Sequence, residues 1–374
     1  MERLKLISAD SHVIEPGDLW TNYMAQEFKD RAPRVEREDD NDVFKCEGIT
    51  LLPVGALSAA GRPSDKVRAQ GSYNNDVPPG SWDPHERVKE MVVDGVEAEV
   101  LYPSIALRMF GLSDRPFQLA CFQAYNSWLA DYCQAYPNRL KGIAMLNVDS
   151  VEDGVGELKR AKKLGLAGGM IPQRPVFGRY DSPMYEPLWE ASTDLDMPLA
   201  IHIGCSRWTP SEGAGAVGQS RGAGAGLVEF TNQEYDMKDN IASIIYSGVF
   251  ERHPTLKIGL VEYEVSWAPY LLYRMDRHYE ERPAMFDETR FKGDMIPSDF
   301  FKRNVYLSFQ EDPVGIQLRE YVGVETLMWG SDYPHAESTF PKSREIVDRI
   351  LEGVPEEEKI LIAGENCAKM FNVS

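Results

Sequence analysis

Short apolar runs alternate with longer amphipathic stretches along almost the whole chain. An apolar run of four to eight residues bounded by turn residues is typical of a buried strand, whereas apolar positions recurring every three or four residues are typical of a helix. The pattern predicts strands at 4–10, 98–103, 140–148, 167–172, 198–204, 256–262, 304–309 and 325–332. It predicts helices at 84–94, 115–136, 151–164, 184–196, 231–250, 267–281, 312–321, 341–352 and 355–371.

The regular order of these elements predicts the fold class. A strand followed by a helix, repeated eight times, indicates an α/β fold in which parallel strands are joined by helical crossovers. Eight such units in 374 residues favour a closed (β/α)8 barrel over an open sheet. We therefore expect residues 1–374 to form a single barrel domain.

Two stretches do not follow the alternation. Residues 31–82 are polar, with clusters of Pro, Gly and Asn, and residues 204–226 are rich in Gly, Ala and Ser. Both follow predicted strands, so in a barrel both are loop insertions near the mouth at the C-terminal face, where active sites lie. Their composition fits a mobile lid and fits a passive surface insertion equally well.

Charge and cysteine content exclude several classes of protein. The formal net charge of −19 and the lack of a Lys/Arg tract argue against partners such as nucleic acids and anionic membranes. The five cysteines show no metal-type or disulfide-type spacing, which fits reduced thiols. With no signal-peptide pattern and no apolar run of membrane-spanning length, we expect a soluble cytoplasmic protein.

Polar side chains end four of the predicted strands. They are Asp10 and His12 in the first strand, His202 in the fifth, Glu262 in the sixth and Asp332 in the eighth. Alternate residues of a strand point the same way, so Asp10 and His12 can both face the barrel axis. Unpaired buried acids are costly, and a metal ion supplies the opposing charge. Imidazole and carboxylate donors together suit Zn²⁺, Mn²⁺ or Fe²⁺.

Each of these residues also has a purely structural explanation. His202 alone fits a hydrogen-bonded core histidine, Asp10 and Asp332 alone fit turn caps, and Glu262 alone fits a partner of Arg274. The meeting of four strand ends at one mouth favours the metal site over these separate explanations. His335 follows Asp332 on the loop at the same face and is a further candidate.

Six stretches, in order over nearly the whole chain, resemble the amidohydrolase superfamily. More narrowly they resemble its amidohydrolase-related branch, which includes aminocarboxymuconate semialdehyde decarboxylase and the resorcylate decarboxylases. The stretches are ISADSHVIEPGDLW (7–20), WDPHERVKEMVVDGVEAEVLYPS (82–104), PLAIHIG (198–204), HPTLKIGLVEYEVSWAPYLLYRMD (253–276), WGSDYPH (329–335) and ILIAGENCAKMF (360–371). The resemblance implies a distorted TIM barrel, a homodimer, and a divalent metal held by Asp10, His12, His202 and Asp332.

The sequence departs from the commonest family pattern at two positions. The first member of the strand-one pair is often His and is here Asp10, and many relatives have a water-activating His where this chain has Glu262. A glutamate can still serve as a general base. A carboxylate can also bridge two metals, and Glu262 with His335 adds enough donors for a second ion. The resemblance extends to dinuclear non-haem iron oxygenases on the same barrel.

Three functions are compatible with these residues. The first is metal-dependent hydrolysis or non-oxidative decarboxylation of a small carboxylated or aromatic substrate by a metal-activated water or a metal-polarised substrate. In it Glu262, His335 and Asp332 are catalytic, and the candidate substrate contacts are Arg174, Arg207 and Trp208. The alternative is an Fe/Fe or Fe/Mn oxygenase. The site would hold one metal ion for the first function and two for this alternative. The third is a metal-stabilised barrel that serves as a partner subunit without activity.

Overall fold

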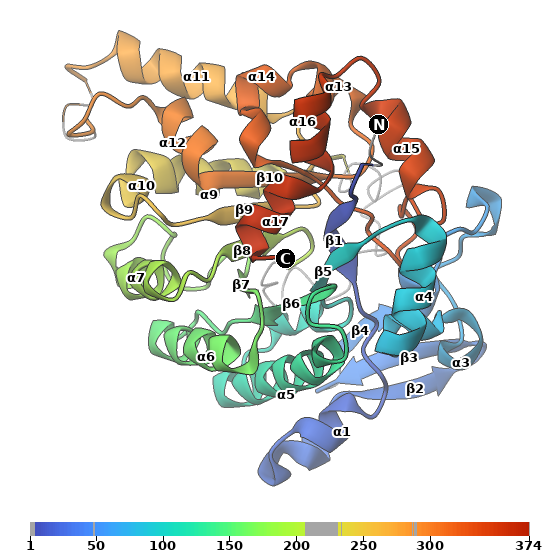
Figure 1. Cartoon of the computed structure of the whole chain (residues 1–374). Coiled ribbons are helices and arrows are strands. Elements are labelled where there is room, and N and C mark those ends of the chain that lie inside the picture. The colour runs from blue at the N-terminus through green and yellow to red at the C-terminus, as the bar shows by residue number, and fades with distance from the viewer. Residues whose placement is uncertain are drawn as a thin grey trace.

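All eight predicted barrel strands are present in the computed structural model, which describes residues 4–47, 49–205, 231–232, 234–285, 287 and 290–373. They form one sheet in the order β1-β5-β6-β7-β8-β9-β10-β11, and the paired neighbours are parallel (Figure 1). The strands are β1 (Ile7–His12), β5 (Ala98–Tyr102), β6 (Leu140–Met145), β7 (Gly168–Ile171), β8 (Leu199–His202), β9 (Ile258–Val261), β10 (Val305–Phe309) and β11 (Leu327–Trp329). The barrel expectation is confirmed.

The first and last strands approach each other where the sheet comes round on itself. The backbone N–H of Asp332 donates to the carbonyl of Asp10 at 2.7 Å, and the N–H of Ser331 donates to Ser8 Oγ at 2.8 Å. Gly330 permits this approach, because a Cβ at that position would lie 2.6 Å from the Cβ of Asp10. The barrel is thus nearly closed, and its closure brings the two aspartates of the first and eighth strands together.

Helices cover the outside of the sheet, and several have the predicted ends. Helix α4 (Pro84–Asp94) begins where the Asp83 side chain accepts the N–H of His85 at 2.8 Å and ends at Gly95, whose φ of 77° suits glycine. The other helices in the first half of the barrel are α5 (Arg115–Gln134), α6 (Val151–Leu164) and α7 (Glu186–Leu195). Because helices lie over the outer face, the strands β1 and β5 are buried along their whole length.

Three helices predicted as continuous are interrupted in the second half of the chain. The predicted helix 231–250 is divided into α9 (Tyr235–Tyr246) and α10 (Val249–Arg252), with Gly248 at φ 73° between them. The predicted helix 312–321 is divided at Leu318, whose φ is −101°, and the last predicted helix contains a π-helical turn at Leu361–Glu365. The remaining α-helices of this half that the structure describes are α11 (Ala268–Glu281), α12 (Pro297–Asn304), α13 (Pro313–Gln317), α14 (Arg319–Val322), α15 (Ser343–Ile350), α16 (Glu356–Ile360) and α17 (Asn366–Phe371).

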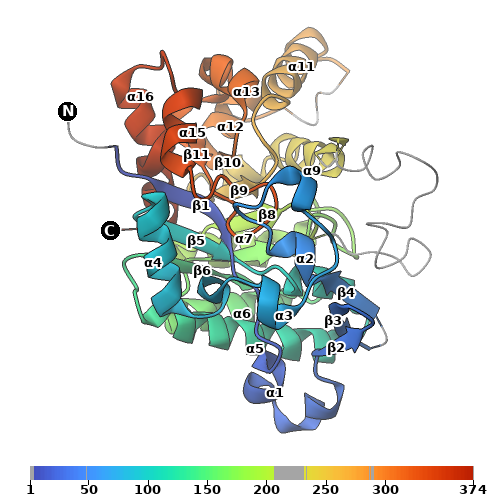
Figure 2. The same cartoon turned by 90° about the vertical axis from the view of Figure 1, so that its right-hand side faces the viewer.

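The insertion at 31–82 contains regular structure that its polar composition did not predict. Helix α1 (Leu19–Tyr23) precedes the insertion. The insertion includes an antiparallel sheet in the order β2-β3-β4. Figure 2 shows this sheet on the side of the barrel away from the two termini. Ala60 donates its N–H to the carbonyl of Pro334 at 3.0 Å, so the insertion reaches the loop that follows β11. Its elements include β2 (Arg34–Glu38), β3 (Asn41–Cys46), β4 (Ile49–Pro53), α2 (Val54–Leu57) and α3 (Tyr73–Asp76).

The second insertion, 204–226, lies outside the described residues except for Gly204 and Cys205. Among the helices that the structure describes, none combines the length and apolar character needed to cross a bilayer.

Candidate metal centre

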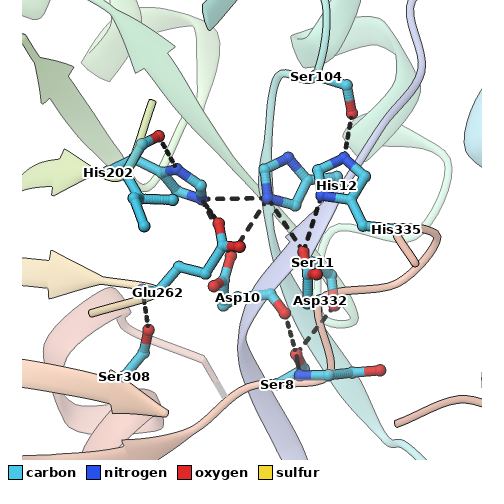
Figure 3. A network of polar contacts seen from close by, with 12 residues as sticks. Ser8, Asp10, Ser11, His12, Ser104, His202, Glu262, Ser308, Asp332 and His335 are labelled. Carbon is cyan, nitrogen blue, oxygen red and sulfur yellow. Dashed lines mark hydrogen bonds and ion pairs between the residues drawn. The ribbon is translucent and has the colours of Figure 1, made fainter. Parts of the chain in front are cut away.

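Five predicted residues and His335 meet at the C-terminal ends of the barrel strands (Figure 3). Asp10 and His12 lie on β1, one residue apart, and both point into the barrel as the alternation of a strand requires. His202 is the last residue of β8. Glu262 directly follows β9, and Asp332 and His335 follow β11. The structure thus brings these side chains together at one face of the barrel, and their roles in metal binding and catalysis stay predictions.

The donor atoms lie at separations that suit a shared ion. His12 Nε2 is 3.1 Å from His202 Nε2, and it is 3.5 Å from both Asp10 Oδ1 and Asp332 Oδ1. His202 Nε2 is 3.4 Å from Asp10 Oδ1 and 3.5 Å from Glu262 Oε2. Ligands about 2.1 Å from one common ion lie about 3.0–3.4 Å from each other in octahedral or tetrahedral geometry. The cluster therefore has the dimensions of a first coordination sphere.

Second partners set the tautomers of the two central histidines. His12 Nδ1 donates to the carbonyl of Pro103 at 2.9 Å, and His202 Nδ1 donates to the carbonyl of Ile203 at 2.8 Å. A carbonyl only accepts, so in each ring Nδ1 carries the proton. With Nδ1 protonated, each ring turns its Nε2 toward the other donors, and this is the nitrogen that can bind a metal once it is free of a proton.

Several carboxylate oxygens of the cluster accept no hydrogen bond within the described part of the chain. Asp10 Oδ2 and both oxygens of Asp332 are buried and have no hydrogen-bond partner among the described residues, although His335 Nδ1 lies 2.9 Å from Asp332 Oδ1. Buried polar oxygens without partners are costly. A cation between them would remove that cost, so the residues present fit a divalent ion.

Two of the strand-end residues have an unusual backbone. Glu262 has φ 66° and Asp332 has φ 54°, in the left-handed region that non-glycine residues adopt infrequently. The conformation of Glu262 is held by its N–H, which donates to Ser308 Oγ at 2.8 Å. Such strained positions gather at functional sites.

Exposure divides the cluster into two groups. The side chains of Asp10, His12, His202 and Asp332 are at most 1% exposed, whereas Glu262 is 16% and His335 is 12% exposed. The four enclosed side chains form the floor of the site. Glu262 and His335 are the two that an approaching molecule can touch. The His335 ring also lies over the His12 ring, with centroids 4.0 Å apart.

A buried ion pair that the sequence interpretation did not include lies behind β1. The fully buried Arg87 donates through Nε to Glu99 Oε2 at 2.6 Å and through Nη1 to the carbonyl of His12 at 2.8 Å. Ser11 Oγ donates to the other oxygen of Glu99 at 3.2 Å. These contacts hold the backbone of the metal-facing strand from the outside. Glu99 is an acid within the otherwise apolar stretch 98–102, and this is the sequence feature that could have indicated the buried ion pair.

Of the candidate substrate contacts, one has no described contact with the cluster and two lie outside the described residues. Arg174 is 56% exposed and forms an ion pair with Asp236 on α9, and its role stays a prediction. Arg207 and Trp208 lie outside the described part of the chain. Arg274 does not serve as the partner of Glu262 in the described contacts, since it bonds to His278 and Tyr270.

Burial and mutual charge set the pKa values of the cluster. Burial, followed by a neighbouring carboxylate, raises the pKa of Glu262 and of Asp332 well above the usual range. Burial lowers the pKa of His202, but the hydrogen bond and charge of Asp10 outweigh it and raise the value to about 9. Burial, with a nearby histidine, lowers the pKa of His12 and of His335 to about 3, so both rings are neutral at pH 7.

Metal loading at pH 7 is therefore expected to release protons. Below pH 9 an ion must displace the proton of His202 and the proton held by Asp332, because ligands bind in the deprotonated form. Apparent affinity should rise with pH, by about tenfold per pH unit for each proton released. Calorimetric titration with Mn²⁺ in two buffers of different ionisation enthalpy measures this release. An affinity that stays flat between pH 6 and pH 9 would contradict it.

Comparison with known proteins places the chain among amidohydrolases. Residues 18–373 match the Amidohydrolase family. The chain is 26% identical over 294 residues to 2-amino-3-carboxymuconate-6-semialdehyde decarboxylase of Dictyostelium discoideum, covering 78% of this chain and 76% of that protein. The decarboxylases among the relatives lend no support to the oxygenase alternative.

Solved structures share the fold at low sequence identity. An amidohydrolase from Mycobacterium avium subsp. paratuberculosis K-10 superimposes with a TM-score of 0.78 at 19% identity, over 99% of this chain and 100% of that one. A 5-carboxyvanillate decarboxylase from Novosphingobium aromaticivorans, complexed with manganese and 4-hydroxy-3-methoxy-5-nitrobenzoic acid, has a TM-score of 0.69 at 19% identity, over 99% and 96%. Because the family match extends over nearly the whole chain, this protein belongs to the amidohydrolase family.

Proposed function

We propose that this protein is a metal-dependent decarboxylase that removes carbon dioxide from a small aromatic carboxylic acid without an oxidant. The observation that carries the proposal is the enclosed floor of two histidines and two aspartates beneath a partly exposed carboxyl group and imidazole. The decarboxylases among its relatives support this choice over hydrolysis.

The floor residues are assigned to the metal. Asp10, His12, His202 and Asp332 would hold one divalent ion, and Mn²⁺ is the ion recorded in the Novosphingobium decarboxylase. Zn²⁺ and Fe²⁺ suit the same donors. When bound, the ion polarises an oxygen of the substrate and neutralises its charge. The enclosure of the four side chains keeps bulk water away from these donors.

Glu262 is assigned the proton transfer. In decarboxylation the bond between the ring carbon and the carboxylate breaks, carbon dioxide leaves, and the electron pair stays on the ring carbon, which then takes a proton. In the metal-free protein, burial and the charge of Asp332 raise the pKa of Glu262, which favours the protonated carboxyl group that a proton donor needs. Its partial exposure places this group on the substrate side of the floor.

His335 is assigned to substrate orientation. Its Nε2 lies 2.9 Å from Ser104 Oγ and its Nδ1 lies 2.9 Å from Asp332 Oδ1, so both ring nitrogens have neighbours that fix the ring. Asp332 thereby serves the metal and the orientation of His335 at once. A ring held in this way limits the positions that a bound substrate can take beside it.

The reaction is tested with the Mn²⁺-loaded protein and a panel of hydroxylated benzoic acids in D₂O. We expect carbon dioxide release with one deuterium at the vacated ring position, seen by NMR and mass spectrometry. Hydrolysis of ester or amide substrates without carbon dioxide release would instead assign the protein to the hydrolases. Uptake of oxygen together with two transition ions per chain, at least one of them iron, would assign it to the oxygenases.

Two further properties are proposed, the first of them from the family resemblance. We expect a homodimer, with a mass by light scattering of twice 42.2 kDa, and a cytoplasmic location. A monomer at micromolar concentration would contradict the first.

A further inference from the structure

The segment that follows β5 touches two histidines of the cluster. The carbonyl of Pro103 accepts from Nδ1 of His12 at 2.9 Å. Ser104 Oγ lies 2.9 Å from Nε2 of His335, and Figure 3 shows this contact. The first contact sets which nitrogen of His12 carries the proton, and the second fixes the plane of the His335 ring. The position of this short segment therefore matters for both imidazoles.

Glu15 holds the next two residues of the same segment. One carboxylate oxygen of Glu15 accepts the N–H of Ile105 and the other accepts the N–H of Ala106, both at 2.9 Å. These N–H groups begin the short helix at Ala106–Gly111, where backbone donors have no partner within the helix. Charge-assisted bonds from both oxygens of one carboxylate constrain direction as well as distance.

The surroundings of Glu15 show that it is not a surface cap. Its side chain is fully buried, three residues beyond His12. The Tyr73 hydroxyl of the insertion donates to the backbone carbonyl of Glu15 at 3.1 Å, and Ile14 donates its N–H to the carbonyl of Ser81 at 3.1 Å. The insertion thus closes over Glu15 and leaves its carboxylate directed at the segment after β5.

We infer that Glu15 is a positioning residue of the metal centre. By holding Ile105 and Ala106 it sets where the Pro103 carbonyl and the Ser104 hydroxyl lie, and through them it orients His12 and His335. Glu15 touches neither the proposed ion nor the substrate. The inference rests on the metal centre proposed above and extends it to a carboxylate that acts through another segment of the chain.

The test is the variant Glu15→Gln, which preserves the side-chain shape. An amide offers one acceptor oxygen, so its NH₂ group would face one of the two backbone donors. We expect a change in the histidine ring ¹⁵N NMR signals of the metal-free protein, confined to two of the six histidines. We also expect Mn²⁺ affinity about 10–100-fold weaker, as for other groups that orient metal ligands, and a changed visible spectrum of the Co²⁺-loaded protein.

The matched control is Glu157→Gln. Glu157 is a buried carboxylate on α6 that accepts from Asn126 Nδ2 of α5 at 2.7 Å and pairs with Arg160, and it has no described contact with the cluster. It should lower the melting temperature while leaving the histidine signals and the Co²⁺ spectrum as in the wild type. Unchanged signals and affinity in Glu15→Gln, with only a lower melting temperature, would overturn the inference.

Two further variants keep the test decisive. If Glu15→Gln does not fold, Glu15→Asp retains the charge but is too short to reach both donors, and the same readouts apply.

Combining Ser104→Ala with either Glu15 variant should give a non-additive loss of affinity, because both act through one segment. Additive losses would overturn the inference. A wild-type protein that binds no Mn²⁺ would reject the proposed metal centre, whereas the metal-free NMR comparison still reports on Glu15.

Discussion

His202→Ala is expected to weaken metal binding by more than about 100-fold, since loss of a ligand should exceed the 10–100-fold effect of losing a group that orients one. The Nε2 of His202 lies 3.1 Å from that of His12 and 3.4 Å from Asp10 Oδ1, so it occupies the centre of the donor set. Removal of the ring leaves the carboxylates without this neighbour and opens a void in the floor of the site. Decarboxylase activity should disappear with the metal. Elemental analysis after dialysis and calorimetric titration with Mn²⁺ measure the loss.

The control for this variant is His253→Ala. His253 is also largely buried, with its Nε2 2.7 Å from Glu186 Oε2, and it precedes β9 at the opposite end of the barrel from the cluster. We expect this variant to keep its metal. Asp332→Asn provides a second, sterically conservative test of the site. Wild-type metal content in both His202→Ala and Asp332→Asn would show that the ion lies elsewhere.

Glu262→Gln is expected to lower kcat by about 10²–10⁴-fold, the usual contribution of a positioned acid or base. The amide preserves the size of the side chain but cannot donate a proton to the ring carbon. Because Glu262 belongs to the exposed group of the cluster and not to its floor, metal content should stay near the wild-type value. Steady-state kinetics on the metal-loaded protein, with metal measured in the same sample, separate the two effects.

Glu264→Gln is the matched control for this second variant. Glu264 lies two residues further on and also has a left-handed backbone, with φ 57°. Its carboxylate accepts the N–H of Gln310 at 3.4 Å and, among the described residues, forms no hydrogen bond or ion pair with the cluster. We expect kcat to change little. A Glu262→Gln variant that retains its kcat would remove Glu262 as the proton donor and transfer that role to another group at the mouth.

Local signals in the sequence were sufficient for many element boundaries. Helices α4 and α6 begin and end at the predicted residues, because each start has an acidic or hydroxyl cap and each end has a glycine with positive φ. Such signals depend on neighbouring residues alone. The break at Gly248 was missed because glycine within a periodic stretch is compatible with a continuous helix.

The sheet of the insertion shows the opposite case. Strand β2 has the sequence RVERE, which is mostly charged and partly exposed, so no apolar run marks it. Its pairing with β3 is a property of two segments together, with Val35 opposite Phe44 and Arg37 opposite Asp42. Composition therefore indicated a loop where cross-strand pairing produces a sheet.

The sequence alone determined the barrel and the convergence of its polar strand ends. The periodicity of apolar residues and the capping residues of helices are local properties of the sequence, and parallel strands of one barrel end at the same face. Only the tertiary structure decided how Pro103, Ser104 and Glu15 act on the two histidines, and how Arg87 supports the strand that carries Asp10 and His12. These partners come from different strands and loops, up to 231 residues apart. Their distances depend on closure of the barrel and on the insertion that packs beside it, which no short stretch of sequence encodes.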